Sequence, residues 1–318
     1  MDCLSLLEYS EETGINEGYA KIGKALEGIT EKIHLAFLAF VNKPISYIQS
    51  DFESFLKLVN VDYADVFIIA CCDKMVEYEA VTGENSLLEL AKTLREQGKI
   101  KFIGFSTHNT EIAHKVISSG EFDVLMYPVN PAFDVLEDEE TYNSDILGNI
   151  WDRAYEYNST GKSGIHPRKS VYDACAQNNI GLVAMKPFAG GFIFGVEETA
   201  GFTAVNLISY ALAQKGISNV VPGCENQGQI EEILTYNTGP DSIRDYSEAV
   251  KNSRWSVKGQ CLYCCHCMPC PAGIDIAGIF KTKDKDLIQK ATSCTKCGEC
   301  ENRCPFDVEI MEKLESFI

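Results

Sequence analysis

Eight cysteines near the C-terminal end are spaced so that they could hold a metal centre. They form two groups, Cys261, Cys264, Cys267 and Cys270, then Cys294, Cys297, Cys300 and Cys304. Pro271 follows the first group and Pro305 follows the second. Three cysteines with two residues between neighbours, then a fourth cysteine followed by proline, is typical of Cys-ligated 4Fe-4S clusters. The pattern predicts two such clusters and a role in electron transfer.

The order of the ligands follows from the shape of the cluster. A 4Fe-4S cube has an iron at four corners, and a short loop can reach three of them; in two-cluster proteins the fourth ligand comes from the other motif. We therefore predict that Cys304 completes the cluster of the first motif and that Cys270 completes the cluster of the second. Only Met268 and Pro269 separate Cys267 from Cys270, one residue fewer than in the second motif. This short closure leaves the exchange of ligands between the loops open.

Structural zinc is the main alternative at these cysteines. Pairs of the form CxxC also make tetrahedral zinc sites, and His266 lies inside the first motif. Two successive triplets of cysteines exceed what tetrahedral zinc requires, so we expect clusters and interpret the extra Cys265 as a spare buried thiol. Oxygen-labile clusters suggest an anaerobic source.

Composition limits the classes of partner. The chain has 318 residues and a formal net charge of -18, which argues against nucleic acid or an anionic membrane and is compatible with a basic redox partner protein. No apolar run is long enough to span a membrane, and the first residues lack the basic flank of a signal peptide. We expect a cytoplasmic protein.

Ahead of the cysteines, apolar runs typical of strands alternate with amphipathic segments typical of helices. Asn85 and Asn109 occupy positions expected for helix N-caps. The strand predictions cover residues 2–9, 32–41, 65–72, 101–107, 123–129, 181–187 and 219–222. The helix predictions cover residues 17–26, 46–59, 86–97, 110–119, 168–178, 204–215 and 227–235.

Seven consecutive βα units predict an α/β fold of the TIM-barrel type, with functional residues in the loops after the strands. The count is one unit short of eight. We expect the barrel to occupy residues 1–240, with an inserted loop and one helix at 133–165, and a helical linker plus a ferredoxin-like iron-sulfur domain to occupy 241–318.

The missing unit predicts an open seam in the barrel. The strands predicted at 2–9 and 219–222 would then have edges with unpaired backbone groups, which must be covered. We expect a second protein chain, another copy of this chain in a homo-oligomer, or the cysteine module to cover them.

Several sequence runs resemble the aldo-keto reductase family, in particular its branch with a C-terminal ferredoxin-like domain. The barrel runs are KIGKAL (21–26), VDYADVFII (61–69), GKIKFIGFSTHN (98–109), VLMYPVNPAFD (124–134), GLVAMKPFAGG (181–191), VVPGC (220–224) and RDY (244–246). The tail runs are CLYCCHCMPCPAGIDIA (261–277) and CTKCGECENRCPFDV (294–308). In that family the KIGKAL helix follows the second strand, so the resemblance implies that the first βα unit is absent.

The resemblance also implies where the reductase machinery would lie. The family uses an Asp, a Tyr, a Lys and a His to protonate a carbonyl while NADPH supplies hydride. The corresponding positions here are Ser10, Ile15, Leu38 and Ala70. None of these side chains can supply that proton transfer, so we expect no NADPH-dependent aldo-keto reduction.

The nicotinamide positions implied by the resemblance are changed as well. Ser106 matches the carboxamide-binding serine, but Met126 replaces the usual Gln and Met185 replaces the stacking aromatic residue. Gln229 stands where an Arg would bind the 2'-phosphate, and Glu225 lies in the same loop. An acidic loop repels a phosphate, so NADP is not expected.

A small polar set remains at the predicted strand ends. Lys186, His108 and Asn130 are candidates for binding an anionic ligand or a further cofactor at the barrel mouth; Asp73, Asn109 and the Cys71–Cys72 pair lie at equivalent positions. The interpretation we favour is that Lys186 and His108 are framework residues satisfied by loop carbonyls, and that the cysteine pair packs as small hydrophobic side chains.

Two redox functions remain open from the sequence. The protein could be an iron-sulfur electron carrier on a degenerate barrel, or a reductase in which clusters deliver electrons to an extra cofactor, such as a flavin or a corrinoid, at the barrel mouth. A third, non-redox possibility is a zinc-stabilised binding scaffold.

Overall fold

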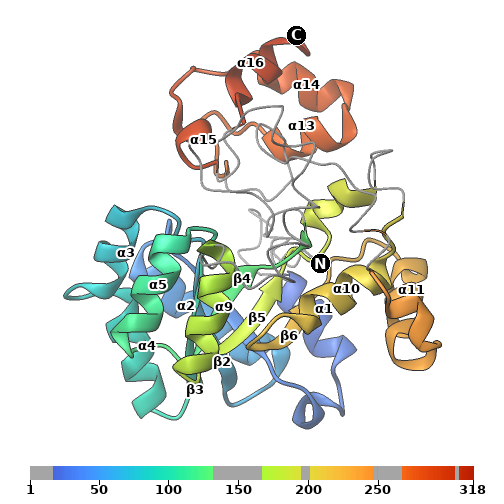
Figure 1. Ribbon diagram of the computed structural model, residues 1–318. Helices are drawn as coiled ribbons and strands as arrows, with labels where there is room; N and C mark the ends of the chain where they lie inside the picture. Colours follow the sequence, from blue (N-terminus) through green and yellow to red (C-terminus); the bar gives the residue numbers. More distant parts are fainter. Residues whose placement is uncertain (1–16, 132–166, 195–200, 247–248, 250–266, 305–307) are drawn as a thin grey trace. The chain divides into compact units, whose positions relative to one another are not determined.

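The computed structural model describes residues 17–131, 167–194, 201–246, 249, 267–304 and 308–318. The described chain has an α/β fold in which a parallel sheet alternates with helices (Figure 1). Six strands form this sheet: β1 (Ala36–Phe40), β2 (Ala64–Ala70), β3 (Ile100–Ser106), β4 (Val124–Pro128), β5 (Gly181–Met185) and β6 (Ile217–Val221). Each overlaps a predicted strand. The prediction at residues 2–9 lies outside the described chain.

The order of the strands in the sheet is their order in the sequence. Every neighbouring pair from β1 to β6 is parallel. This is the order found in the wall of a (β/α) barrel, whereas a doubly wound sheet reverses its order part-way. Strand β6 has no buried residue and pairs with β5 alone among the described strands, as expected of an edge.

Helices connect the strands at close to the predicted positions. They are α1 (Glu17–Ala25), α2 (Ile45–Val59), α3 (Met75–Thr82), α4 (Leu87–Glu96), α5 (Thr110–Ser119), α9 (Pro167–Gln177), α10 (Ala204–Ala213) and α11 (Gln227–Thr238). Short 3-10 turns lie at Thr30–Lys32, Ala189–Phe194 and Asp241–Arg244. Helix α3 was not among the predicted helices, and the helix predicted within 133–165 falls outside the described residues.

One of the two predicted N-caps is confirmed. The side chain of Asn109 accepts hydrogen bonds from the backbone amides of Glu111 and Ile112 at the start of α5. The prediction for Asn85 was wrong, because Ser86 caps α4. Asn85 instead adopts a left-handed backbone conformation with φ of 52°.

Aromatic rings form the core between the sheet and its covering helices. Phe37 on β1 and Phe67 on β2 stack with ring centroids 5.5 Å apart, and Phe52 and Phe55 of α2 pack against Phe37 at 5.1 and 5.5 Å. Tyr19 of α1 joins the same group. These five rings are at most 6% exposed, so they attach α1 and α2 to the strands.

The chain divides into two compact units. One comprises residues 1–128, 168–185 and 212–221 and contains all six described strands. The other comprises residues 129–167, 186–211 and 222–318 and contains both cysteine motifs. The chain therefore passes from one unit to the other five times, after residues 128, 167, 185, 211 and 221.

The described C-terminal residues are helical. They form α13 (Ile276–Thr282), α14 (Lys285–Ala291), α15 (Glu299–Asn302) and α16 (Ile310–Glu315). Buried aliphatic side chains of Ile274, Ile279 and Leu314 make a small core of their own. Across the described chain, no helix combines the length and the apolar character that crossing a membrane requires.

Candidate functional site

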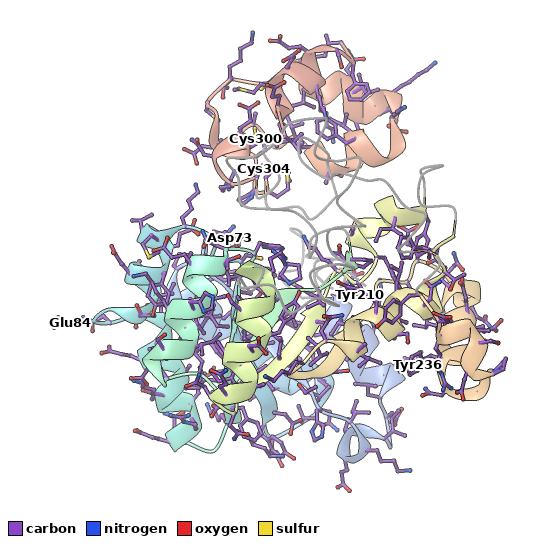
Figure 2. The ribbon with its side chains drawn as sticks, viewed as in Figure 1. Asp73, Glu84, Tyr210, Tyr236, Cys300 and Cys304 are labelled. Carbon is purple, nitrogen blue, oxygen red and sulfur yellow. The ribbon has the colours of Figure 1, made fainter. Side chains whose placement is uncertain are left out.

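Four of the predicted cluster ligands line a single pocket in the C-terminal unit. Cys270 comes from the first motif, and Cys294, Cys297 and Cys300 come from the second. Cys304, the fourth cysteine of the second motif, is not among the lining residues, although it lies close to Cys300 in Figure 2. This is the ligand set that the sequence predicts for the second cluster.

The pocket wall around these thiols is apolar. Its aliphatic lining comes from the loop before α13, from α13 itself and from α16, and consists of Ile274, Ile276, Met311 and Leu314. The pocket is narrow, so a group larger than a water molecule could enter only if side chains of the wall moved.

The arrangement of the four thiols bears on the kind of metal. In the described part of the chain, no group of three or more His, Cys, Asp or Glu side chains could hold a metal ion. Tetrahedral zinc needs its ligands to converge on one point, whereas a 4Fe-4S cube takes one thiolate at each iron. The kind of metal centre that these four cysteines hold stays a prediction.

The first motif is only partly described. Cys261 and Cys264 lie outside the described residues, so their positions relative to Cys267 are not known. Cys267 is 7% exposed, and Cys304 is half-buried. The assignment of these four cysteines to one cluster stays a prediction.

Arg303 ties the two motifs together. One of its terminal nitrogens, Nη2, donates hydrogen bonds to the backbone carbonyls of Cys267 and Pro269, each at 3.0 Å. Its Nε donates to the carbonyl of Glu299, also at 3.0 Å, and the side chain lines the thiol pocket. Sequence reasoning missed this residue.

In the other unit, the interior face of the sheet is apolar where hydride chemistry would need polar groups. Leu38 and Ala70, where the sequence resemblance predicts the Lys and the His, pack in one cluster with Met126 and Met185. Ser106 is 4% exposed, and its hydroxyl lies 3.9 Å from the sulfur of Met185. The other two tetrad positions, Ser10 and Ile15, are outside the described residues.

Gly104 makes this interior packing possible. It lies on β3 opposite Ile68 of β2. A methyl group in place of its hydrogen would lie 2.9 Å from Cγ1 of Ile68 and 3.1 Å from Cγ1 of Val66. The aliphatic side chains of β2 therefore fill the space beside the glycine.

Asp73 and His108 form a hydrogen-bonded pair beyond the carboxyl ends of β2 and β3 (Figure 2 labels Asp73). One carboxylate oxygen accepts from the Thr107 hydroxyl and the His108 amide, and the other lies 3.0 Å from Nδ1 of His108. The His108 ring is 7% exposed. The Asp73 carboxylate therefore fixes the orientation of the imidazole, whereas the sequence predicted that loop carbonyls would do so.

The other two barrel-mouth candidates contact each other through the backbone. Asn130 is fully buried, and its Nδ2 donates to the carbonyl oxygen of Lys186 at 2.9 Å. The same carbonyl accepts from the amide of Ala189. Lys186 has φ of 53°, in the left-handed region, directly after β5. Asn130 thus holds the backbone of the loop after β5 in shape.

The Cys71–Cys72 pair packs as expected of small hydrophobic side chains. Cys71 contacts the apolar interior cluster, and Cys72 is fully buried. Burial raises the pKa of the Cys72 thiol far above its ordinary value, and the nearby Glu77 and Asp73 carboxylates add to the effect. Cys72 is therefore a protonated, unreactive thiol.

A second charged group lies at the opposite, amino-terminal ends of the strands. Asp65 is 7% exposed and accepts hydrogen bonds from the Leu35 amide and from Lys101 Nζ, both at 2.9 Å, while His34 lies at 3.4 Å. Burial opposes ionisation of Asp65, but these three hydrogen bonds outweigh it and lower its pKa. Polar residues at this end of barrel strands usually contribute to stability and not to catalysis.

Residues 41–142 match the model of the aldo/keto reductase family. The match is a similarity of this segment, which makes up less than half of the chain. It covers α2 to β4 and includes Ala70, Asp73, Ser106, His108 and Met126. The cysteine motifs lie outside it, so the family match carries no information about iron-sulfur clusters.

Solved aldo/keto reductases show a distant likeness to the chain. An aldo-keto reductase from Bacillus halodurans, AKR11C1 in its holo form, is 14% identical, covers 75% of this chain and 79% of its own, and gives a TM-score of 0.49. Aldose reductase from Giardia lamblia is 15% identical over 74% and 80%, also with a TM-score of 0.49. The fold of this chain therefore rests on its own strand order.

Within the matched segment, Ala70 and Met126 lie in the packed apolar cluster. Asp73 and His108 lie in the loops that follow β2 and β3, three and two residues after the last residue of the respective strand.

Proposed function

We propose that this protein is an iron-sulfur electron-transfer protein whose chain carries two 4Fe-4S clusters and also forms an aldo/keto-reductase-like parallel sheet. The observation that supports it most is the pocket lined by Cys270 together with Cys294, Cys297 and Cys300. Residues separated by 24 positions in the sequence meet there, in the combination that interleaved two-cluster binding requires.

The cluster, when bound, supplies one-electron transfer. The chain's own residues would hold it and control its surroundings. The four thiolates would bind the irons, the aliphatic side chains of Ile274 and Leu314 would exclude water from one side, and Arg303 would place a positive charge on the pocket wall. The net charge of -18 favours a redox partner with a basic docking surface.

The apolar interior of the sheet supports an electron carrier over a hydride-transferring reductase. Leu38 and Ala70 have no side-chain proton to exchange, and Met126 and Met185 are packed apolar side chains where the resemblance places polar and aromatic contacts to the nicotinamide. A purified protein that oxidises NADPH with simple aldehydes would contradict this part of the proposal.

The decisive experiment is anaerobic purification followed by iron and sulfide analysis of single-cysteine variants. The wild-type protein should contain about eight irons and eight sulfides and absorb broadly near 400 nm. Cys270→Ala and Cys297→Ala should lose the same cluster, leaving one set of electron paramagnetic resonance signals, whereas Cys304→Ala should lose the other. Cys175→Ala is the matched control, since that thiol is buried in the other unit. Zinc without colour would contradict the proposal.

A reductase with an additional cofactor is the second candidate, and the Asp73–His108 pair favours it. A carboxylate that fixes Nδ1 of a histidine beyond the strand ends is the arrangement used to orient a proton-transferring imidazole. A second chromophore, such as a flavin or a corrinoid, copurifying with the clusters would support this candidate. Clusters alone would support the carrier.

A further inference from the structure

The contacts of Arg303 fall on the part of the first motif that is one residue short. Its Nη2 donates to the carbonyls of Cys267 and Pro269, which bound the tight closure leading to Cys270. Its Nε donates to the carbonyl of Glu299 in the second motif. One planar guanidinium therefore fixes the backbone of both motifs at once.

This closure decides where Cys270 points. Cys270 lines the pocket with the second motif, while the residue three positions earlier, Cys267, does not line it. With two residues between these cysteines, the backbone must turn sharply for their thiols to diverge. A backbone held by two hydrogen bonds from a charged donor keeps that turn in place.

Arg303 also brings charge to the pocket. It lines the same pocket as the four cysteines, and its neighbour in sequence is Cys304, a predicted ligand of the other cluster. Adding an electron to a cluster adds negative charge, and a fixed cation nearby favours that reduced state. The effect on the reduction potential depends on the charge. The hydrogen bonds to the two carbonyls depend on the planar guanidinium, which Lys lacks.

We propose that Arg303 is a positioning residue for both metal centres: it directs Cys270 into the second motif and raises the reduction potential of the cluster bound there. The inference rests on the proposed function. Arg303 would thereby compensate for the residue that the first motif lacks between Cys267 and Cys270.

The test compares three variants of the full-length protein, purified and reconstituted without oxygen. R303Q removes both the charge and the planar guanidinium, R303K keeps the charge and loses the planar guanidinium, and K285Q removes an exposed cation of α14 that does not line the pocket. Two quantities are measured: the potentials of the clusters by dithionite titration followed by electron paramagnetic resonance, and the rate of iron release to the chelator bathophenanthroline.

We expect R303Q to shift the reduction equilibrium of one cluster about tenfold toward the oxidised form, or about 59 mV for one electron, and to release iron faster than wild type. R303K should release iron faster with its potentials nearly unchanged. K285Q should match wild type in both measurements.

Unchanged potentials and release rates in an R303Q protein with about eight irons would overturn the proposal. If R303Q does not fold, R303K provides the test. Iron release from R303K at the wild-type rate would show that the planar guanidinium is not needed. A wild-type protein without iron would overturn the proposed function itself, which is distinguishable from a wild-type protein with both clusters and an unaffected variant.

Discussion

Replacing Gly104 by alanine tests whether the interior face of the sheet is packed as a core. The added methyl would lie 2.9 Å from Cγ1 of Ile68, whereas carbon atoms in ordinary contact are about 3.5–4.0 Å apart. Overpacking of this kind costs about 1–3 kcal/mol, and the lower entropy of the unfolded alanine chain returns about 0.4–1 kcal/mol. A net loss of about 1–2 kcal/mol lowers Tm by roughly 2–8 °C for a unit of this size.

The matched control is Gly181→Ala on β5. A methyl there would meet its nearest atom, Oγ of Ser218, at 3.6 Å, which is ordinary contact. We expect G181A to be as stable as wild type or slightly more stable in urea denaturation followed by far-ultraviolet circular dichroism. In an I68A background, which removes the crowding side chain, G104A should cost little. Equal stabilities of G104A and G181A in the wild-type background would refute a packed interior.

Three further changes test the scaffold in the same denaturation assay. Phe37→Ala should cost about 3–5 kcal/mol because the ring is buried among four others, whereas Phe102→Ala, at a residue 48% exposed, should cost far less; similar losses would contradict the aromatic core. Asp65 has a lowered pKa, so its ionised form stabilises the fold above about pH 4 and that stability is lost as the pH falls. Asp65→Asn should therefore reduce the fall in the free energy of unfolding between neutral and acidic pH. An unchanged fall would show that other groups cause it. Asn109→Ala should cost about 0.5–2 kcal/mol, whereas Asn109→Asp, which keeps a side-chain acceptor at the start of α5, should cost less; equal losses would contradict the cap.

The order and type of the described strands could be predicted from sequence, because strands buried on both faces are nearly continuous apolar runs. Helix α5 was predicted with its observed bounds, since a capping Asn109 and a following glycine mark both ends. Helix α3, Met75–Thr82, was missed because its apolar side chains form no single stripe. At its start, the Glu77 carboxylate accepts hydrogen bonds from the amides of Asp73 and Lys74. Such a polar contact leaves no periodic apolar pattern in the sequence.

The candidate site was predictable in its residue types and less so in its pairings. Asp73 and His108 were both noted at strand ends, yet their contact follows only from β2 and β3 being neighbours in the sheet. Arg303 was missed because it binds backbone carbonyls, which every residue has and which leave no mark in a sequence. The absence of hydride chemistry, expected from Leu38 and Ala70, stays a prediction; the structure shows that both residues lie in a packed apolar cluster.

The five passages of the chain between its two compact units have a practical consequence for anyone who wishes to transplant the cysteine-rich tail. Described residues encoded between β4 and β6, such as Asn130 and Lys186, belong to the same unit as the tail. A fragment made by one cut would contain the cysteine motifs without the earlier segments of the same unit. A chimaera that exchanges this unit between homologues should therefore join the two sequences at several of these crossing points and not at one.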